Sequence, residues 1–255
     1  MDEPAIAFRN VIYRMNGRVL LGPLELAIFR GETLVLLGRS GSGKTTALKL
    51  INRLLQESEG DVLVEGRSTR AWDVISLRRH VGYVIQETGL FPHYTVEKNV
   101  GLVPKLLGNP ESEIHERVDA MLRLVDLDPQ EFRQRYPHQL SGGQRQRAGV
   151  ARALAADPPI LLMDEPFGAL DPLSRVELQR QFLGIQKRVR KTTVLVTHDV
   201  GEALLLADRI ALLERGKLLG IHTRQQFLES ADNSVAAYRA AWSGNLPSTG
   251  ESCHG

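Results

Sequence analysis

The chain has 255 residues, of which 42% are apolar, enough to bury the core of one large α/β domain or two small ones. Its 32 Lys and Arg and 30 Asp and Glu give a formal net charge of +2. The sequence shows no basic arm or stripe, so we expect no nucleic-acid partner.

Features of secreted and membrane-spanning chains are also missing from the sequence. Cys253 is the single cysteine, which excludes a disulfide within one chain and suits a reducing compartment. The N-terminus has no basic region followed by an apolar core, and no apolar run approaches the roughly 20 residues that cross a bilayer. We therefore expect a soluble chain that reaches a membrane only through a partner.

Two kinds of strand are predicted in chain order. Apolar residues alternate with polar ones in half-buried, antiparallel strands, at Ile6 and Phe8, at Leu24, Leu26 and Ile28, and at Val62 and Val64. Continuously apolar runs, typical of parallel strands covered on both faces, occupy 33–38, 159–166 and 192–199. Function in such sheets gathers at the C-terminal ends of the strands.

A helical lobe is predicted between these strands, over about 90–155. Within it, helical spacing between Pro110 and Pro129 places apolar residues on one face at Ile114, Val118, Met121, Leu122 and Val125. We expect this lobe to be inserted into an α/β core, and residues 241–255 to form a disordered tail.

The sequence "GRSGSGKTT" (38–46) follows a predicted strand and precedes a helix. Its glycines let backbone N–H groups surround phosphate oxygens, Lys44 reaches the β- and γ-phosphates, and the Thr45 hydroxyl ligates magnesium. This pattern indicates a phosphate-binding loop for ATP. The predicted binding residues are Gly38, Arg39, Ser40, Gly41, Ser42, Gly43, Lys44, Thr45 and Thr46.

Two carboxylates end the apolar run at 159–166. Asp164 can hold magnesium through a water, although an Asp-Glu pair alone could simply cap a strand. Glu165, at the strand end, could orient or deprotonate a water for attack on the γ-phosphate, which favours hydrolysis over transfer to an alcohol as in kinases.

His198 has two readings of equal weight from spacing alone. It ends the run at 192–199, where it could donate a hydrogen bond to the γ-phosphate. It could equally belong to a helix start, because Asp199 and Glu202 form a D-x-x-E capping box there.

A second glycine-rich helix start lies in "LSGGQRQRAGVARAL" (140–154). Ser141 is the expected N-cap with Gln144 as its capping-box partner, and Gly142 and Gly143 leave the first backbone N–H groups open to an anion. An ordinary capped helix is the alternative. Since the first loop already surrounds one nucleotide, we infer that the second serves a nucleotide bound to another copy, in a two-fold dimer.

These motifs together resemble the nucleotide-binding subunit of ABC transporters, over about residues 5–240. The resemblance rests on the phosphate loop, Gln86, "LSGGQ", "LLMDEP", "ALD" (169–171) and His198, in this order. It implies a P-loop NTPase core with a mainly parallel sheet, an antiparallel β subdomain and an inserted helical subdomain.

The resemblance also implies roles for matching residues. Glu165 would be the catalytic base, His198 the γ-phosphate switch, and Gln86 a contact to magnesium and water. Asp171 would contact the partner across the dimer while capping a helix that has Pro172 at its first position. One departure concerns adenine recognition. The family usually stacks an aromatic ring on the adenine from an early loop, whereas Met15 occupies that position here and Tyr13 lies two residues earlier.

The segment 81–108 points to a membrane partner. The turn Gly89–Pro92, with Phe91, matches the place where the family receives a helix of the permease, although a surface turn with a buried Phe is the alternative. Further likeness to ATPases of osmoprotectant importers (glycine betaine, choline, carnitine or proline) comes from "INRL" (51–54), "GLFPH" and "VPKLLG".

The resemblance therefore implies an importer ATPase on the cytoplasmic face of the cell membrane. Its expected partners are permease subunits, a second copy and, indirectly, a solute-binding protein. The chain ends without the C-terminal regulatory domains of many such ATPases, which leaves an amino-acid or other small-solute importer as the alternative. A soluble ABC protein without a transport role is less favoured, because neither a second nucleotide domain nor a coiled-coil insertion is visible.

Overall fold

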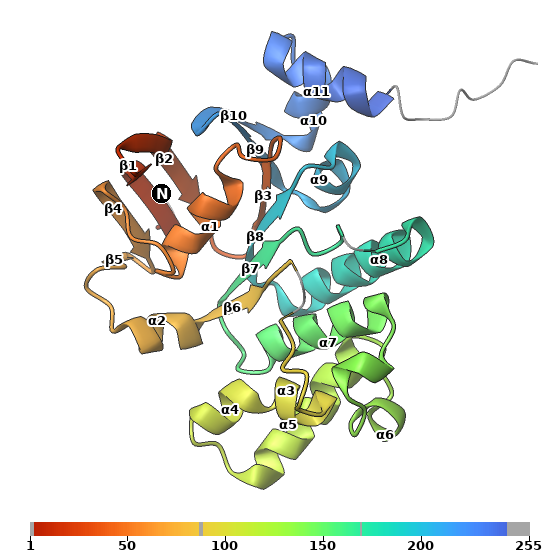
Figure 1. Cartoon of the computed structure of the whole chain (residues 1–255). Coiled ribbons are helices and arrows are strands. Elements are labelled where there is room, and N and C mark those ends of the chain that lie inside the picture. Colours follow the sequence, from red (N-terminus) through yellow and green to blue (C-terminus); the bar gives the residue numbers. More distant parts are fainter. Residues whose placement is uncertain (1–2, 87–88, 169, 244–255) are drawn as a thin grey trace, which may run out of the picture.

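The computed structural model describes residues 3–86, 89–168 and 170–243, and arranges them as two β-sheets with helices packed between and beside them (Figure 1). The strands are β1 Ile6–Met15, β2 Arg18–Ile28, β3 Thr33–Leu37, β4 Glu59–Val64, β5 Arg67–Ser68, β6 Val81–Val84, β7 Ile160–Asp164, β8 Thr192–Thr197, β9 Arg209–Glu214 and β10 Lys217–Thr223. The helices are α1 Lys44–Ile51, α2 Val74–His80, α3 Val96–Val100, α4 Leu102–Leu106, α5 Glu111–Leu124, α6 Pro129–Phe132, the 3-10 helix η1 Pro137–Gln139, α7 Gly142–Leu154, α8 Pro172–Val189, α9 Val200–Leu206, α10 Arg224–Glu229 and α11 Asn233–Ser243.

The two sheets confirm the predicted fold class. The smaller sheet is antiparallel with the order β2-β1-β4-β5, and the larger has the order β10-β9-β3-β8-β7-β6. In the larger sheet the strands from β9 to β6 pair in parallel, and β10 alone is antiparallel to its neighbour. The first five residues of the run at 33–38 form β3, which pairs with β8, from the run at 192–199, and with β9. Sequence analysis did not specify β6, β9 or β10.

The position of β3 between two cores explains its continuous run of apolar residues. Leu34 and Leu36 face the core that lies between the two sheets and contains α1. Val35 and Leu37 face the opposite core, beneath α7, α8 and α9. Because successive side chains of a strand point to opposite faces, a sheet covered on both sides needs an unbroken apolar run.

Helices α3 to α7 connect β6 to β7, within the region expected to form the helical lobe. The five apolar residues expected on one helix face, four of them in α5, are all buried in the larger core. Figure 1 shows these helices gathered at one end of the molecule, below the sheets. The limits expected for this lobe, residues 90 and 155, remain a prediction, because secondary structure alone does not define where a subdomain begins and ends.

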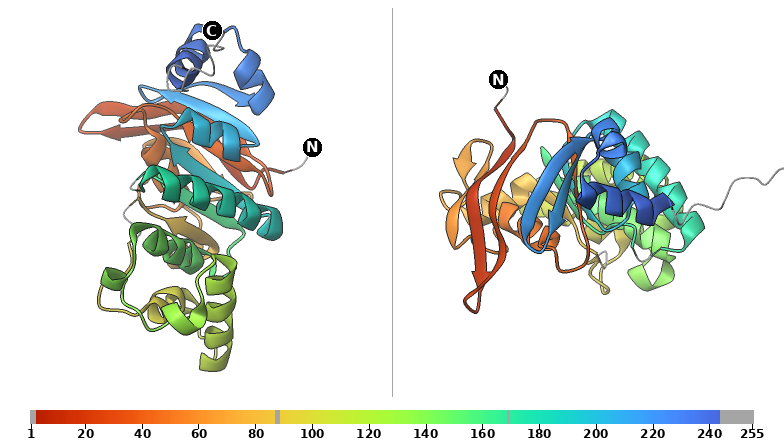
Figure 2. Two further views of the ribbon diagram at one scale, coloured as in Figure 1. Left: turned by 90° about the vertical axis from the view of Figure 1, so that its right-hand side faces the viewer. Right: turned by 90° about the horizontal axis from the view of Figure 1, so that it is seen from above.

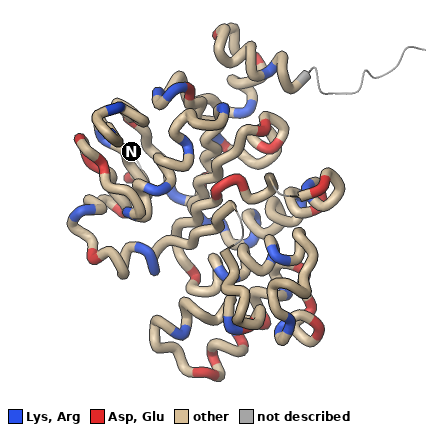
Figure 3. Tube along the Cα trace, viewed as in Figure 1, with Lys and Arg blue, Asp and Glu red and all other residues tan. Residues whose placement is uncertain are grey.

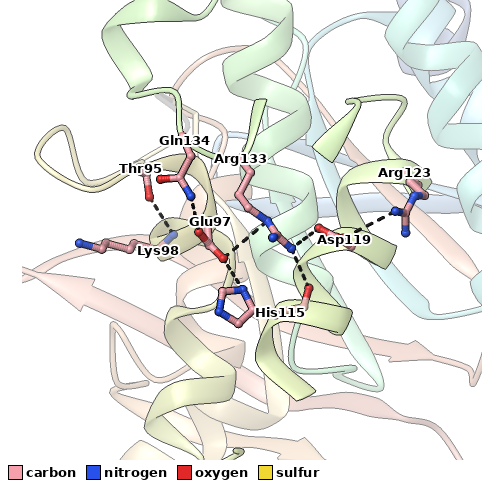
Figure 4. A network of polar contacts seen from close by, with 8 residues as sticks. All are labelled: Thr95, Glu97, Lys98, His115, Asp119, Arg123, Arg133 and Gln134. Atoms are coloured by element: carbon pink, nitrogen blue, oxygen red, sulfur yellow. Dashed lines mark hydrogen bonds and ion pairs between the residues drawn. The ribbon is translucent and has the colours of Figure 1, made fainter. Parts of the chain in front are cut away.

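A polar network joins three parts of this lobe (Figure 4). Glu97 of α3 lies 2.5 Å from His115 Nδ1 of α5 and accepts a hydrogen bond from Gln134 Nε2 at 2.9 Å. Arg133 pairs with both Glu97 and Asp119, so one guanidinium bridges α3 and α5. The network fixes the segment before the second glycine-rich loop to the helix that follows Phe91.

The C-terminal part continues as helices rather than ending at the last strand. Residues 241–243, expected to begin a disordered tail, belong to helix α11, and the rest of that prediction falls on residues 244–255, which lie outside the described residues. Two further views place α11 over the end of the sheet near β10 (Figure 2). Lys and Arg are dispersed among Asp and Glu over the molecule (Figure 3). Across the described ranges, no helix combines the length and apolarity that crossing a membrane requires.

The packing of β3 makes a stability prediction. Leu36 is 1% exposed and its backbone pairs with both β8 and β9. Leu36→Ala should lower the free energy of unfolding by about 2–5 kcal/mol through lost burial and a residual cavity, measured by urea denaturation. Leu173→Ala is the control, since Leu173 is 84% exposed and should change stability by less than about 0.5 kcal/mol. Equal losses in both variants would contradict the assignment of β3 to the core.

Candidate functional site

The predicted phosphate loop lies between β3 and α1 and surrounds a cavity of about 430 Å³. Lys44 begins α1, and its Nζ donates to the carbonyl oxygens of Gly38 at 2.7 Å and Arg39 at 3.0 Å. The cavity is lined by Leu20, Ser40, Gly41, Ser42, Gly43, Lys44, Thr45, Thr46, Gln86 and Glu165. Most of the residues predicted from the motif therefore face one space. Gly38 and Arg39 are not in this lining, and they contact it through their carbonyl oxygens, which accept from Lys44 Nζ.

Two glycines of this loop are required by backbone geometry. A Cβ at Gly38 would lie 2.2 Å from the Leu213 carbonyl oxygen, closer than any side chain tolerates. Gly43, the N-cap of α1, has φ of +99°, a conformation that favours glycine. Both glycines let the chain turn directly from the buried end of β3 into a helix whose first N–H groups face the cavity.

Lys44 and the two carboxylates form a charged group inside this partly buried space. Burial lowers the pKa of Lys44, and the nearby charges of Glu165 and Asp164 raise it. The side chain is only 4% exposed. An ammonium held under a phosphate-sized cavity in this way is suited to bind an anion, which would also compensate its lost hydration.

Asp164, the last residue of β7, is joined to the loop by a hydrogen bond. The Thr45 hydroxyl donates to Asp164 Oδ1 at 2.9 Å, and the Tyr83 hydroxyl donates to Oδ2 at 3.4 Å. Burial raises the pKa of Asp164, and the hydrogen bond from Thr45 partly offsets this rise. Tyr83 was missed by sequence analysis. Its own pKa is raised by burial and by the charge of Asp164, so its hydroxyl remains a neutral donor.

The three residues expected to be catalytic meet at one carboxylate oxygen. Glu165 Oε2 lies 3.4 Å from Gln86 Nε2 and 3.4 Å from His198 Nδ1. They follow β7, β6 and β8 respectively, so adjacent parallel strands bring them to one edge of the sheet. Glu165 has φ of +45°, and its N–H donates to the Val196 carbonyl oxygen at 3.0 Å, which fixes this left-handed turn.

Only one of the two hydrogen bonds of the expected capping box forms in the segment around His198. Asp199 accepts from Glu202 N at 3.1 Å as predicted. The reciprocal bond is replaced, because Glu202 Oε2 accepts from the Thr197 hydroxyl at 2.5 Å and the Asp199 N–H donates to that hydroxyl at 3.0 Å. Glu202 is therefore buried beneath the turn, where burial raises its pKa. His198 itself is half exposed and stays available to a ligand.

The second glycine-rich loop starts α7 as predicted, with a complete capping box. Gln144 N donates to Ser141 Oγ at 3.2 Å, and Ser141 N donates to Gln144 Oε1 at 2.9 Å. A cavity of about 200 Å³ here includes Ser141, Gly143 and Gln144 in its lining and, within the described residues, shares no residue with the phosphate-loop cavity. The two loops of one chain thus face different spaces.

The fold alone gives no reason for the glycines of this second loop. A Cβ added to Gly142 would lie 3.6 Å from Leu170 Cδ2, and one added to Gly143 would lie 4.0 Å from Ser174 Cβ. These are ordinary contacts among the described residues, and neither glycine has a positive φ. Their missing side chains therefore leave the α7 N–H groups open toward the outside of the chain.

Asp171 caps α8 as predicted, accepting from Ser174 N at 3.1 Å, with Pro172 at the first helical position. Hydrogen bonds from Ser174 hold the pKa of Asp171 below its usual value. Its neighbour Ala169 lies outside the described residues. The expected contact of Asp171 across a dimer is not tested by a single chain and stays a prediction.

Neither residue considered for adenine contact, Met15 or Tyr13, lines the phosphate-loop cavity. Met15 ends β1 and is 52% exposed, whereas Tyr13 packs against the core between the sheets. Leu20 of β2, which sequence analysis missed, lines the phosphate-loop cavity. Its position three residues after Gly17, in the turn between β1 and β2, carries no motif, so only the folded chain places it there.

A groove beside Phe91 occupies the expected place for a partner. It has a volume of about 240 Å³ and includes Arg78, Arg79, Tyr83, Phe91, Leu102 and Arg152 in its lining. The Phe91 turn is held by the buried Asn99, whose Oδ1 accepts from Phe91 N at 2.7 Å and whose Nδ2 donates to the Phe91 carbonyl oxygen at 3.1 Å. The Phe91 side chain is 41% exposed, so the alternative of a buried Phe is wrong.

Comparison with known proteins identifies the family. The family model for ABC transporters matches residues 21–168. The chain belongs to the ABC transporter family. It is 49% identical over 218 residues to the glycine betaine/carnitine/choline transport ATP-binding protein OpuCA of Bacillus subtilis, covering 86% of this chain and 57% of that protein.

Two further comparisons extend this ABC assignment. The glycine betaine uptake system ATP-binding protein YehX of Escherichia coli is 47% identical, over 84% of this chain and 69% of that protein. A dimeric post-hydrolysis structure of the ATP-binding cassette MJ0796, bound to ADP and Pi, superposes with a TM-score of 0.76 at 33% identity, covering 86% of this chain and 98% of that one. The chain spans somewhat more than half the length of the first relatives it matches.

The raised pKa of Asp164 predicts a pH-dependent penalty. Because its folded-state pKa lies above the unfolded value, the ionised carboxylate destabilises the chain increasingly as the pH rises through the folded pKa. Without nucleotide or divalent cations, Asp164→Asn should therefore be more stable than the wild type at about pH 7, by on the order of 1 kcal/mol, and the gain should shrink toward about pH 4. Urea denaturation across this range measures both.

Asp171→Asn is the matched control. The pKa of Asp171 is lowered rather than raised, so loss of its charge should give no stability gain that grows with pH. A pH-independent difference between wild type and Asp164→Asn would contradict the burial of an ionised Asp164.

Proposed function

We propose that this chain is the ATP-hydrolysing subunit of an ABC importer, and that the solute is a quaternary-amine osmoprotectant such as glycine betaine or choline. One observation carries the ATPase part of this proposal. Lys44, Gln86 and Glu165 line a single cavity at the C-terminal edge of the parallel sheet, with His198 in contact with Glu165. This is the arrangement that in-line attack of water on a terminal phosphate requires.

The roles follow from the contacts. The backbone N–H groups at the start of α1 and the Lys44 ammonium bind the phosphates. Glu165 orients and deprotonates the attacking water, and Gln86, 3.4 Å away, fixes the same water from the other side. His198 donates to the γ-phosphate and, through its contact with Glu165, links the occupancy of the phosphate site to the position of the base.

The oxygen ligands present suit Mg²⁺. Thr45 Oγ1 and Asp164 Oδ1 lie 2.9 Å apart, and hard oxygen donors with few protein ligands are what Mg²⁺ prefers beside phosphates. Burial raises the pKa of Asp164, and a cation beside this carboxylate would favour its ionised form, which supports this fit. Thr45, Asp164 and Gln86 would hold the ion, and the ion would neutralise charge on the phosphates.

A second copy would complete each nucleotide site. The α7 start faces a space separate from the phosphate loop, and its glycines are not required by contacts within the described part of the chain. Ser141, Gly142, Gly143 and Gln144 would bind the nucleotide held by the partner, head to tail, with Asp171 at the same interface. The dimeric MJ0796 structure supports this association.

The groove beside Phe91 would receive a helix of the permease. An exposed aromatic ring with leucine and arginine around it is suited to the apolar face of an amphipathic helix that carries acidic side chains. OpuCA is named as a transporter subunit for glycine betaine, carnitine and choline and YehX as one for glycine betaine, which supports the solute class. Since these relatives are longer, their solutes and partners are extended to this chain only as part of the proposal.

Separate variants should resolve ATP binding from hydrolysis. Lys44→Ala should abolish most ATP binding, because the loop loses its buried cation. Glu165→Gln should retain binding and lower kcat by about 10²- to 10⁴-fold. In light scattering, ATP should convert Glu165→Gln to a dimer and leave Lys44→Ala monomeric. A Glu165→Gln chain that stays monomeric at saturating ATP, or that loses binding as Lys44→Ala does, would contradict these roles.

The solute class can be tested by uptake of labelled glycine betaine and choline at high osmolarity, in cells whose other uptake systems are removed. Cells with the intact gene should accumulate the label, and cells with a deletion or the Glu165→Gln variant should not. Equal accumulation in all three strains removes the osmoprotectant assignment and leaves the ATPase assignment to the binding experiment.

A further inference from the structure

Helix α11 contacts the phosphate loop from the far end of the chain. The Arg39 N–H, in the loop, donates to the Tyr238 hydroxyl oxygen at 3.2 Å, across a sequence separation of 199 residues. The Arg39 carbonyl oxygen accepts from Lys44 Nζ at 3.0 Å and from Ser42 N at 3.1 Å. One residue of the loop is therefore fixed by α11 on its amide side and by Lys44 on its carbonyl side.

The same helix also contacts the segment that follows His198. Trp242 lies one helical turn after Tyr238 and thus on the same face of α11. A Cβ added to Gly201 of α9 would lie 3.3 Å from Trp242 Nε1, so the indole rests directly against this backbone. Both aromatic rings are half-buried against the larger core. Helix α11 is thereby anchored on α9, three residues from the predicted switch.

Between these contacts the helix does not pack tightly. A cavity of about 520 Å³ separates part of α11 from the loop, and its lining includes Arg39, His198, Glu214, Ser234, Ala237 and Tyr238. With open space at this junction, the Tyr238 hydroxyl rather than broad apolar packing ties the helix to Arg39. Removal of the Tyr238 hydroxyl oxygen should therefore loosen the backbone of the phosphate loop at Arg39.

We propose that Tyr238 is a positioning residue for the phosphate loop. Its hydroxyl accepts from the N–H of the Gly38–Arg39 peptide, and the Gly38 carbonyl oxygen on the opposite side of the same peptide plane accepts from Lys44 Nζ at 2.7 Å. Tyr238 thus holds this peptide in the orientation that points its carbonyl oxygen at the lysine, and so preorganises Lys44 and the following N–H groups before ATP binds. The inference rests on the proposed function, since it assigns Tyr238 a part in ATP binding. It makes α11 a component of the nucleotide site although no nucleotide-binding motif includes it.

The test is Tyr238→Phe, which keeps the ring and its packing and removes the hydroxyl that accepts from the Arg39 N–H. Binding of ATP to the purified full chain, measured by calorimetry, should weaken by about 2- to 10-fold, the range expected for one net hydrogen bond. In steady-state hydrolysis the KM for ATP should rise more than kcat falls, because bound phosphates order the loop themselves. Amide hydrogen exchange at Arg39 should become faster without nucleotide.

Tyr136→Phe is the matched control, since it removes the same atom from a ring that stacks on His138 outside the phosphate loop. It should leave ATP affinity and exchange at Arg39 unchanged, and both variants should keep the thermal midpoint of the wild type. The proposal is overturned if Tyr238→Phe binds ATP as tightly as the wild type, if Tyr136→Phe weakens binding equally, or if affinity falls without faster exchange at Arg39. A wild-type chain that binds no ATP would instead overturn the proposed function, and this inference with it.

Discussion

The burial of both faces of one parallel sheet is the constraint on which the nucleotide site depends. Strands β3, β6, β7 and β8 must be apolar along their length because a core lies on each side. Polar side chains can then appear only where these strands end. Parallel pairing brings those ends to the same edge, so Gln86, Glu165 and His198, which follow β6, β7 and β8, meet without any direct attraction being needed to assemble them.

This arrangement places charge where it is costly. Asp164 and Lys44 are nearly inaccessible to solvent. Burial raises the pKa of Asp164 and lowers the pKa of Lys44, and both shifts favour the neutral form. The site is held together by a few specific bonds, from Thr45 to Asp164 and from Lys44 to two loop carbonyl groups. The two apolar cores compensate the free energy that this charge burial costs. A bound phosphate would neutralise the buried charge of Lys44, and a bound cation would neutralise that of Asp164.

Much of the site could be predicted because its chemistry depends on local spacing. The phosphate loop, the Asp164–Glu165 pair and the Ser141 capping box each lie within a few consecutive residues, and strand or helix context follows from hydrophobic periodicity. The same reasoning correctly predicted strands in both sheets, β1, β2 and β4 in one and β3, β7 and β8 in the other, and the apolar face of α5. It overstated the Asp199 capping box, because a buried Thr197 competes for the Glu202 carboxylate, a tertiary effect that spacing does not show.

Residues missed from sequence share one property: their partners are distant along the chain. Tyr83 reaches Asp164 from a neighbouring strand, and Leu20 reaches the phosphate-loop cavity from the other sheet. Each is an ordinary residue in its own segment, without a cap, turn or charge pattern to mark it. Such contacts arise only after the strands have taken their order in the sheet, which no local pattern specifies.

The glycines at the start of α7 separate folding from assembly. Because a side chain at Gly143 would meet only ordinary contacts within the described part of the chain, a larger residue there should leave an isolated molecule folded and soluble. The defect would arise at the proposed junction between two copies, where a side chain would stand in the path of a phosphate. Screens that score expression or melting temperature would accept such a variant, so damage at this position is visible only to assays that require two chains to close on nucleotide.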